Sequence, residues 1–420
     1  MMDNAFHKGA NMKTVEQLVK DYARLVIESG INLYKGQSLL IKTSYDGYYF
    51  AQALAESAYD HGAQLVKIEI NDLKLMRKRT ETQSIETLSL LPDYEKQVDY
   101  EMMAKDWAYI YIDNTEDRFW LADADATRLS ALRSTTSRWH HIYQTSRMRH
   151  EHPWCVICAP GPVWARKVLG GKATTENLWH ILEPILKLDA DDPAKAWTEY
   201  CDMLLGRCAW LDSLQIAQLN YTSAKTDLTI GFREEHLWAG GGDPLPNGRW
   251  FLPNIPTEEV FTVPDLATAQ GHVATTRPVS VMDSLVEDAL ITFEKGKVVS
   301  CTARIGQSVM DSFLKTDEGA SRLGEVALVD EQSAIARSQW IFGSILFDEN
   351  ASCHLALGAG YPSCLKGSAK LSSDAQLIAA GCNVSLVHTD FMVGCADMEI
   401  IALTRSGEQV VIMENGKFTH

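Results

Sequence analysis

Residues 39–70, LLIKTSYDGYYFAQALAESAYDHGAQLVKIEI, predict how the N-terminal half of the chain folds. Leu39–Lys42 and Leu65–Ile70 are apolar runs of strand length, and Phe50–Tyr59 between them repeats its apolar residues with helical spacing. A third apolar run follows at Ala108–Ile112. Because a strand, a helix and a second strand in this order favour a parallel sheet, we expect an α/β domain in this half.

One helix is predicted near each end of this half of the chain. Apolar residues at three-and-four spacing predict a helix that begins near Val15 and ends near Gly30. A second helix is predicted in DPAKAWTEYCDMLLGRC, residues 192–208, because Asp192-Pro193 is typical of a helix N-terminus. We place a domain boundary after this segment, so that the N-terminal domain comprises residues 1–208.

The C-terminal half, residues 209–420, has a different pattern. Leu228–Phe232 and Ala289–Cys301 are strand-like, and the second of these contains Lys295-Gly296 at a turn position. The terminal part, Ile400–Phe418, carries Ser-Gly and Asn-Gly pairs where hairpins would turn. We therefore expect an α+β domain with antiparallel strands.

Composition excludes several classes of partner. The chain has 420 residues, 46% of them hydrophobic, which is enough for a real core in two domains. A net charge of -16 repels phosphate backbones and anionic lipid, so we expect neither nucleic acid nor a membrane as a partner. The start, MMDNAFHKGANMK, lacks the apolar core of a secretory signal, and the nine cysteines are scattered. These features predict a cytoplasmic protein.

Candidate metal ligands occur first in VSLVHTDFMV, residues 384–393. His388 and Asp390 are two residues apart in an apolar strand pattern, so an imidazole and a carboxylate would project from one face. Asp, Glu, His and Cys supply most metal ligands in proteins. The alternative is a strand end at which both residues are solvated.

A second candidate segment is LFDENASCHLALGAGY, residues 346–361. It carries Glu349, His354 and Tyr361 beside a Gly-rich stretch. Glu349 and His354 are five residues apart and would lie on different faces of a helix, so their convergence requires irregular backbone. The alternative is a helix cap followed by a buried core histidine.

Further carboxylates stand in apolar or turn-forming surroundings. These are Glu325 in RLGEVALV and the pair Glu258-Glu259 in NIPTEEVFTVPD. Adjacent residues of an extended segment face opposite ways, so only one of Glu258 and Glu259 can point inward. Glu325 is either a site residue or an exposed residue at the start of a strand.

Taken in order, five segments resemble motifs of the thermophilic metalloaminopeptidase family, which includes aminopeptidases T and S and leucyl aminopeptidase-like members. The segments are NIPTEEVFTVP, TDEGASRLGEVALV, LFDENASCH, GAGY and SLVHTD. They run over most of the C-terminal half. The N-terminal half is similar more loosely, in GINLYKGQSLLI and RLSALRS.

The resemblance implies a dinuclear metal site in the C-terminal half. The implied ligands are Glu259, Glu325, Glu349, His354, His388 and Asp390, with Glu325 bridging both ions. The choice of Glu259 over Glu258, and of ligand rather than outer-shell status for Glu349, stays open. The implied metals are zinc, cobalt or magnesium, since an oxygen-rich ligand set is compatible with several divalent ions.

The implied activity is removal of N-terminal amino acids from short peptides by a metal-activated water. Glu258 or an outer-shell carboxylate would carry the proton to the leaving amine, and Tyr361 would donate a hydrogen bond to the tetrahedral intermediate. The resemblance also implies a homodimer in which the N-terminal domain encloses the active site.

Three other functions compete with this interpretation. Gly240–Gly242 and Gly358–Gly360 lack the full glycine pattern of a nucleotide-binding loop. Cys155 and Cys158 lie in WCVICAP with no second ligand pair at zinc-site spacing, which indicates a buried strand. The remaining alternative is a catalytically silent peptide-binding or scaffold protein of the same fold.

Overall fold

A computed structural model describes residues 13–113, 116, 118–121, 123–282 and 284–420. The expectation of no secretory signal depends on the start of the chain, and residues 1–12 are not among the described residues. The chain forms two compact units. Unit 1 comprises residues up to Trp197 together with Pro244–Ile255, and unit 2 comprises Thr198–Asp243 and Pro256–His420.

Unit 1 contains a parallel five-stranded sheet with the strand order β10-β4-β3-β1-β2. Its strands are β1 (Leu39–Thr43), β2 (Val66–Ile70), β3 (Ala108–Asp113), β4 (Trp154–Cys158) and β10 (Asn254–Ile255). Every pairing in this sheet is parallel. Ile41, Ile110 and Ile157 are fully buried in three successive neighbours. The predicted α/β fold is therefore confirmed, and Cys155 and Cys158 belong to a buried strand, as predicted.

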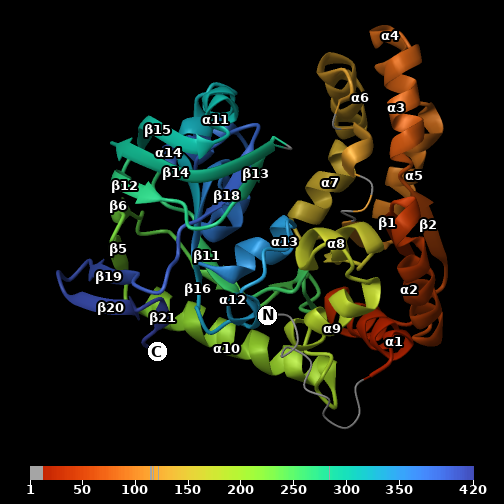
Figure 1. The fold of residues 1–420 in the computed structure, drawn as a ribbon, viewed down its shortest axis with the longest axis horizontal. Coiled ribbons are helices and arrows are strands. Elements are labelled where there is room, and N and C mark those ends of the chain that lie inside the picture. The colour runs from red at the N-terminus through yellow and green to blue at the C-terminus, as the bar shows by residue number, and fades with distance from the viewer. Residues whose placement is uncertain (1–12, 114–115, 117, 122, 283) are drawn as a thin grey trace. The chain divides into compact units, whose positions relative to one another are not determined.

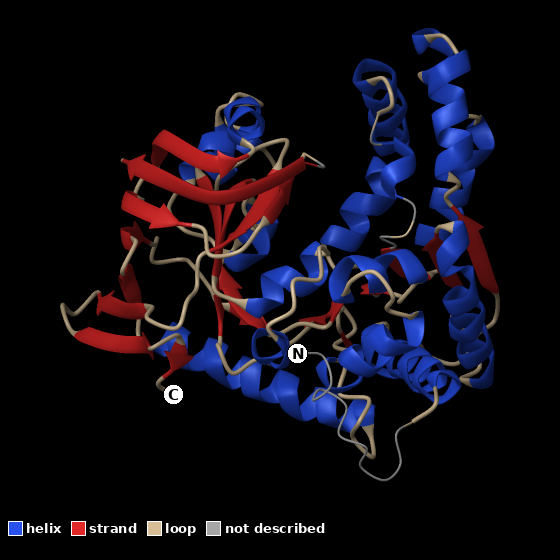
Figure 2. Cartoon of the chain, in the orientation of Figure 1, coloured by secondary structure: helices blue, strands red, loops and turns tan. Residues whose placement is uncertain are grey.

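Helices make up most of the rest of unit 1 (Figure 2). They are α1 (Val15–Leu25), α2 (Tyr48–Asp60), α3 (Leu73–Thr82), α4 (Ile85–Leu88), α5 (Asp93–Ala104), α6 (Ala126–Trp139), α7 (His141–Met148), α8 (Pro162–Leu169) and α9 (Thr175–Ile185). The first helix begins after Thr14, whose side chain accepts the amide of Gln17, and a π-helical turn prolongs it to Gly30. The predicted start and end of this helix are thus confirmed.

The predicted domain boundary and the change between the two units both lie in α10 (Pro193–Ser213). The chain passes from unit 1 to unit 2 after Trp197, whereas the sequence prediction places the boundary after Cys208. Pro244–Ile255 joins unit 1 because β10 pairs with β4. At the start of this segment, β8 (Asp243–Pro244) pairs with β9 (Trp250–Phe251) in a short two-stranded ribbon. The N-terminal domain of residues 1–208 stays a prediction.

The larger sheet of unit 2 has nine strands and is antiparallel wherever strands pair. Its strands are β5 (Ile216–Ser223), β6 (Thr226–Gly231), β12 (Gln270–Ala274), β13 (Val279–Val281), β14 (Ser284–Glu294), β15 (Lys297–Ile305), β19 (Glu399–Thr404), β20 (Gln409–Glu414) and β21 (Lys417–Phe418). Lys295 and Asn415 have positive φ, as do the glycines that follow them, so two of the predicted hairpin turns form at these pairs.

The second sheet of unit 2 has five antiparallel strands in the order β18-β17-β16-β11-β7. They are β7 (Ala239–Gly240), β11 (Glu259–Thr262), β16 (Leu323–Val329), β17 (His354–Gly358) and β18 (His388–Met392). Short helices connect or flank the strands of this unit (Figure 1): α11 (Gln307–Phe313), α12 (Ala334–Ser338), α13 (Ile345–Asp348) and α14 (Asp374–Ala379). The predicted antiparallel α+β fold of the C-terminal half is confirmed.

One hydrophobic core serves both sheets of unit 2. Val260, Val326 and Leu355 supply apolar side chains from the five-stranded sheet, and Leu219 and Ile400 supply them from the nine-stranded sheet. Because side chains alternate along a strand, a sheet that uses one face for the core leaves its other face for different residues. No helix among the described residues is long and apolar enough to cross a membrane.

Candidate metal centre

The five-stranded sheet of unit 2 carries predicted metal-binding side chains on the face opposite the core. Residues in register on neighbouring strands share a face. Glu325 of β16 is in register with Ala356 of β17, and Ala356 is in register with Asp390 of β18. His354 lies two residues before Ala356, and His388 lies two residues before Asp390. The strand alternation therefore puts these two carboxylates and two imidazoles on one face.

Glu259 reaches the same face from β11. It is in register with Val329, which lies four residues after Glu325 on β16. Glu259, Glu325 and His354 offer ligand atoms that all lie within 4.8 Å of one another, and all three residues are buried. The Nε2 atom of His354 is 3.0 Å from Oε2 of Glu259. Two carboxylates and one imidazole thus form the first potential metal-binding cluster.

Glu325, His388 and Asp390 form a second cluster, whose ligand atoms also lie within 4.8 Å of one another. The Nε2 atom of His388 is 3.3 Å from Oε2 of Glu325 and 3.3 Å from Oδ1 of Asp390. Glu325 belongs to both clusters and is only 3% exposed, so it is not the solvated strand start that the sequence left open. One carboxylate with two oxygens is thereby placed between two groups of ligands.

In each of the two imidazoles, the second ring nitrogen, Nδ1, lies within hydrogen-bond distance of a backbone carbonyl oxygen. Nδ1 of His354 lies 3.2 Å from the Ser352 oxygen, and Nδ1 of His388 lies 2.7 Å from the Ala359 oxygen. A carbonyl oxygen only accepts, so Nδ1 of each ring carries a hydrogen and donates it. In the neutral ring this leaves the lone pair on Nε2, directed at the carboxylates. Metal-binding histidines almost always donate from their second nitrogen to a carboxylate, a backbone carbonyl or water, and both rings follow this pattern.

The crowding of acidic groups shifts the pKa values within the clusters. Burial raises the pKa of Glu325 to about 7, although the His388 imidazole acts in the opposite direction. Burial alone lowers the pKa of His388, but Asp390 and Glu325 outweigh it and raise that pKa to about 11. Burial likewise lowers the pKa of His354, and Glu259 reverses the effect and holds it well above its ordinary value. The clusters therefore stabilise positive charge placed among them.

Glu349 adds a further carboxyl to this acidic environment. It lies in the 3₁₀ turn Glu349–Ala351 that follows α13, so the irregular backbone expected between Glu349 and His354 is present. Burial raises the pKa of Glu349 well above its usual range, and the negative charges of Asp390 and Glu259 add to the shift. Glu349 therefore interacts electrostatically with both clusters without belonging to either.

Tyr361 lies against the second cluster. Its ring meets the His388 ring edge to face, with 5.1 Å between the ring centres. Burial raises the pKa of the Tyr361 hydroxyl well above its ordinary value, and the carboxylates of Glu325 and Asp390 raise it further. The hydroxyl therefore stays protonated beside the acidic groups and can act as a hydrogen-bond donor.

Glu258 and Glu259 differ in what their carboxylates contact. Oε2 of Glu258 accepts the backbone amide of Ala334 at 2.9 Å, in the first turn of α12. The Glu258 amide in turn donates to Oδ1 of Asn350 at 2.6 Å. Glu259 instead faces His354, as described above. The two neighbours thus point in different directions, as extended backbone requires.

The donor set fits divalent cations. Oε2 of Glu259 and Oδ1 of Asp390 are buried, and they lie 3.0 Å and 3.3 Å from Nε2 of His354 and of His388, respectively. Because the pKa of each imidazole is raised, a proton on Nε2 lies between the two atoms when no metal ion is bound. A buried anionic oxygen in this position needs a proton or a metal ion. Carboxylate oxygens together with imidazole nitrogens suit several divalent ions of the first transition series.

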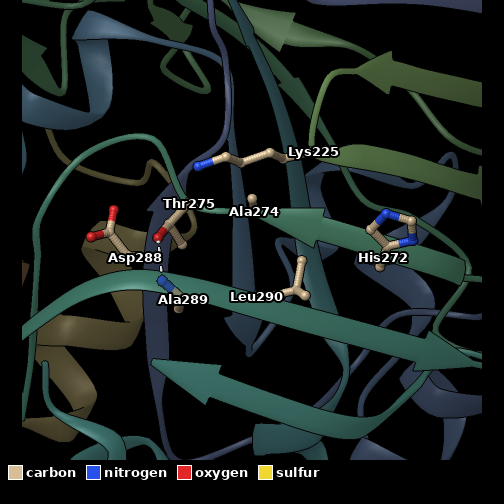
Figure 3. Close-up of a pocket in the computed structure, with 7 residues that line it drawn as sticks. All are labelled: Lys225, His272, Ala274, Thr275, Asp288, Ala289 and Leu290. Atoms are coloured by element: carbon tan, nitrogen blue, oxygen red, sulfur yellow. Dashed lines mark hydrogen bonds between the residues drawn. The ribbon is translucent and has the colours of Figure 1, made fainter. Parts of the chain in front are cut away.

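A separate hollow lies on the nine-stranded sheet (Figure 3). It measures about 300 Å³ and is lined by Lys225, His272, Ala274, Thr275, Asp288, Ala289 and Leu290. Within it, the Thr275 hydroxyl accepts the Ala289 amide at 2.9 Å. The hollow shares no residue with the two clusters. Its described lining residues form no close group of potential metal ligands.

Sequence reasoning did not identify the residues that shape the surroundings of the clusters. Ala327 is in register with both Phe261 and His354, and Ala356 is in register with Glu325 and Asp390. These alanines supply small side chains where larger ones would occupy the space between the ligand groups. Small residues at alternate strand positions were the available signal, but alternation alone does not distinguish this face from the core face.

Three comparisons place the chain among known proteins. The sequence model described as thermophilic metalloprotease (M29) matches residues 15–418. Aminopeptidase AmpS of Bacillus subtilis is 33% identical over 97% of this chain and 100% of its own length, and aminopeptidase T of Thermus aquaticus is 33% identical over 94% and 97%. The solved structure of wild-type AmpT from Thermus thermophilus matches with a TM-score of 0.89 and 30% identity over 96% of this chain and 100% of that one.

Proposed function

This chain belongs to the thermophilic metalloprotease (M29) family, and from this premise we propose that it is a metal-dependent aminopeptidase that releases N-terminal amino acids from short peptides. The observation that carries the proposal is the pair of adjoining clusters that share Glu325. Two divalent ions, of zinc, cobalt or magnesium, would be held by Glu259, Glu325 and His354 on one side and by Glu325, His388 and Asp390 on the other. Ions so placed would activate a water and polarise the peptide carbonyl.

The free α-amino group of a peptide explains the proposed preference for chain ends. In its neutral form this group offers a nitrogen lone pair, and a divalent ion held by the clusters would bind it and orient the substrate. An internal peptide bond has no such group nearby and would lack this anchor.

Two carboxyls are candidates for moving the proton from the attacking water to the leaving amine. Glu349 fits because its carboxyl interacts with Asp390 and Glu259, so it lies next to the acidic groups of the site. Glu258, the residue chosen from the sequence, stays a candidate, although its carboxylate accepts the Ala334 amide. We favour Glu349 for this role. Its alternative role is that of an additional metal ligand.

Tyr361 is proposed to stabilise the tetrahedral intermediate. Its hydroxyl stays protonated, and its ring is held against His388 at the edge of the second cluster. A donor fixed in advance near the developing oxyanion lowers the barrier without reorganising during the reaction. This role requires the hydroxyl and not the ring alone.

The remaining properties implied by the family resemblance are part of the same proposal. We propose a homodimer whose N-terminal domain restricts the active site to short peptides, and sedimentation would give its mass. All nine cysteines are free thiols, which suits the reducing cytoplasm proposed as its location.

Hydrolysis of leucyl-p-nitroanilide tests the proposed function. Purified protein loaded with zinc or cobalt should hydrolyse it, and removal of the metal with a chelator should abolish the activity until metal is restored. Metal analysis of the same samples should give about two ions per chain. Hydrolysis that survives complete metal removal would contradict the metal-dependent mechanism. Less than one ion per chain with no hydrolysis would instead favour the catalytically silent peptide-binding protein.

A further inference from the structure

Phe261 lies beside the proposed metal centre on the ligand-bearing sheet face. It is two residues after Glu259 on β11, so the two side chains project from the same face. In register on either side of Phe261 are Ala239 of β7 and Ala327 of β16. Both neighbours carry only a methyl group. The Phe261 ring therefore stands above them and stays partly exposed.

The position of Phe261 relative to the ligands is set by the sheet. Ala327 separates Phe261 from His354, and each is in register with it. Two strand spacings place the backbones of Phe261 and His354 roughly 10 Å apart. The Phe261 side chain and a large first side chain of a substrate can together bridge this span. A substrate bound by its amine at the clusters can therefore reach Phe261 with its first side chain.

Tyr361 extends the aromatic surface from Phe261 to the metal-binding groups. The rings of Phe261 and Tyr361 meet at 60° with 5.4 Å between their centres, and Tyr361 meets His388 at 61° with 5.1 Å. Edge-to-face contacts of this kind fix the orientation of the rings. Phe261, Tyr361 and His388 thus form a continuous row in which the last member belongs to the second cluster.

Apolar side chains pack against the rings of Phe261 and Tyr361. Val263, Cys364 and Cys382 are buried in a small hydrophobic cluster, and Phe261 and Tyr361 pack against it. This cluster is separate from the main core of unit 2. An apolar wall favours an apolar side chain and disfavours a charged one, which would lose its hydration there.

From this arrangement we infer that Phe261 and Tyr361 form the subsite for the side chain of the substrate's N-terminal residue, and that the preferred substrates are peptides that begin with a large apolar residue. The inference rests on the proposed aminopeptidase function. It assigns Phe261 to specificity, because its ring contacts the substrate side chain and none of the reacting atoms. Tyr361 contributes its ring to this wall in addition to its hydroxyl.

Substitution of Phe261 tests the inference through a ratio of two substrates. In Phe261→Ala, kcat/KM for leucyl-p-nitroanilide should fall about tenfold relative to kcat/KM for alanyl-p-nitroanilide, since an apolar pocket distinguishes side chains by amounts of this size. Calorimetry should show the same loss for binding of the product L-leucine relative to L-alanine, neither of which can be hydrolysed. Metal content should stay as in the wild type. Phe418→Ala, which removes a partly buried phenylalanine from β21, is the matched control and should leave both ratios unchanged.

A second variant decides the case in which Phe261→Ala loses metal or folds poorly. Phe261→Trp keeps the wall and enlarges it, so it should bind metal and shift the preference toward the alanyl substrate. Unchanged leucyl-to-alanyl ratios in a metal-loaded variant at this position would overturn the subsite. Failure of the proposed function would look different, because the wild type itself would then hydrolyse neither substrate in a chelator-sensitive way.

Discussion

At the scale of single residues, the decisive feature is how the two imidazoles are held. Nδ1 of His354 and Nδ1 of His388 each donate to a backbone carbonyl, and Nε2 of each faces carboxylates. A histidine that merely fills the core would use both nitrogens for hydrogen bonds or leave one in an apolar environment. Here the ring orientation is fixed before any ion binds, which lowers the entropy lost on binding.

Replacement of His388 by Ala tests this arrangement. The variant loses the only imidazole of the second cluster among the described residues, so metal content should fall and kcat/KM should drop by at least about 100-fold. Element analysis and p-nitroanilide hydrolysis measure the two effects. His272→Ala, a change on the nine-stranded sheet, should leave both values near those of the wild type. A fully metallated, active His388→Ala variant would refute the assignment of this residue.

Some site residues could be predicted from local spacing and others could not. The two-residue interval between His388 and Asp390 predicts a shared face, and β18 places them on one. For Glu325, local sequence allowed an exposed or a buried position, because its burial depends on strands β11 and β17 that pair with β16. Phe261 gave no local signal at all, since apolar residues in strands usually belong to the core.

At the scale of elements, the site depends on the alternation of the five-stranded sheet. One face carries Val326 and Leu355 into the core, and the other carries Glu325 and His354. A shift of register by one residue would exchange the two faces. Burial of the apolar face therefore also determines where these side chains point, and the core fixes the geometry of the proposed metal centre.

The small side chain of Ala356 gives this account a test. Ala356 is in register with Glu325 and Asp390, so Ala356→Val places two methyl groups between their carboxylates. We expect metal content to fall, with a loss of unfolding free energy of about 1–3 kcal/mol. Leu355→Ala, on the opposite face, should lose about 2–5 kcal/mol of unfolding free energy but keep its metal. Equal metal content in both variants would contradict the proposed role of the alanine.

The sequence predicted elements with strong local signals and missed those that depend on distant partners. Hairpin turns at Lys295-Gly296 and Asn415-Gly416 follow from residues that tolerate positive φ. Two-residue strands such as β7 and β10 have no periodicity to detect, and they exist because β11 and β4 provide edges for pairing. Their positions are set by tertiary structure alone.

At the scale of the whole molecule, the division of the chain into two units could be predicted only in part from the sequence. The change from a parallel to an antiparallel sheet could be predicted, because it follows from alternating helices and strands in one half and hairpins in the other. The membership of Pro244–Ile255 in unit 1 could not, because it requires the chain to return to β4 after entering unit 2. All members of the two ligand clusters belong to unit 2.

Removal of metal should lower the stability of the folded protein. Bound ions would link β11, β16, β17 and β18 and neutralise the three carboxyls of the clusters, so an ion present at about 1,000 times its dissociation constant adds about 4 kcal/mol. The thermal unfolding midpoint should fall on treatment with a chelator and recover when metal is added. His388→Ala should respond much less. An unchanged midpoint in chelator-treated wild type, with metal loss verified, would show that the ions contribute nothing to the fold.

The most direct test of the central claim is a crystal structure with added zinc, in which anomalous scattering locates the ions. We predict two peaks about 3.5–4 Å apart, one bound by Glu259 and His354 and the other by His388 and Asp390, with Glu325 between them. Two peaks at these side chains would establish a dinuclear centre built on one sheet face. Absence of zinc from the face that carries Glu325, or its binding elsewhere in the chain, would contradict the account.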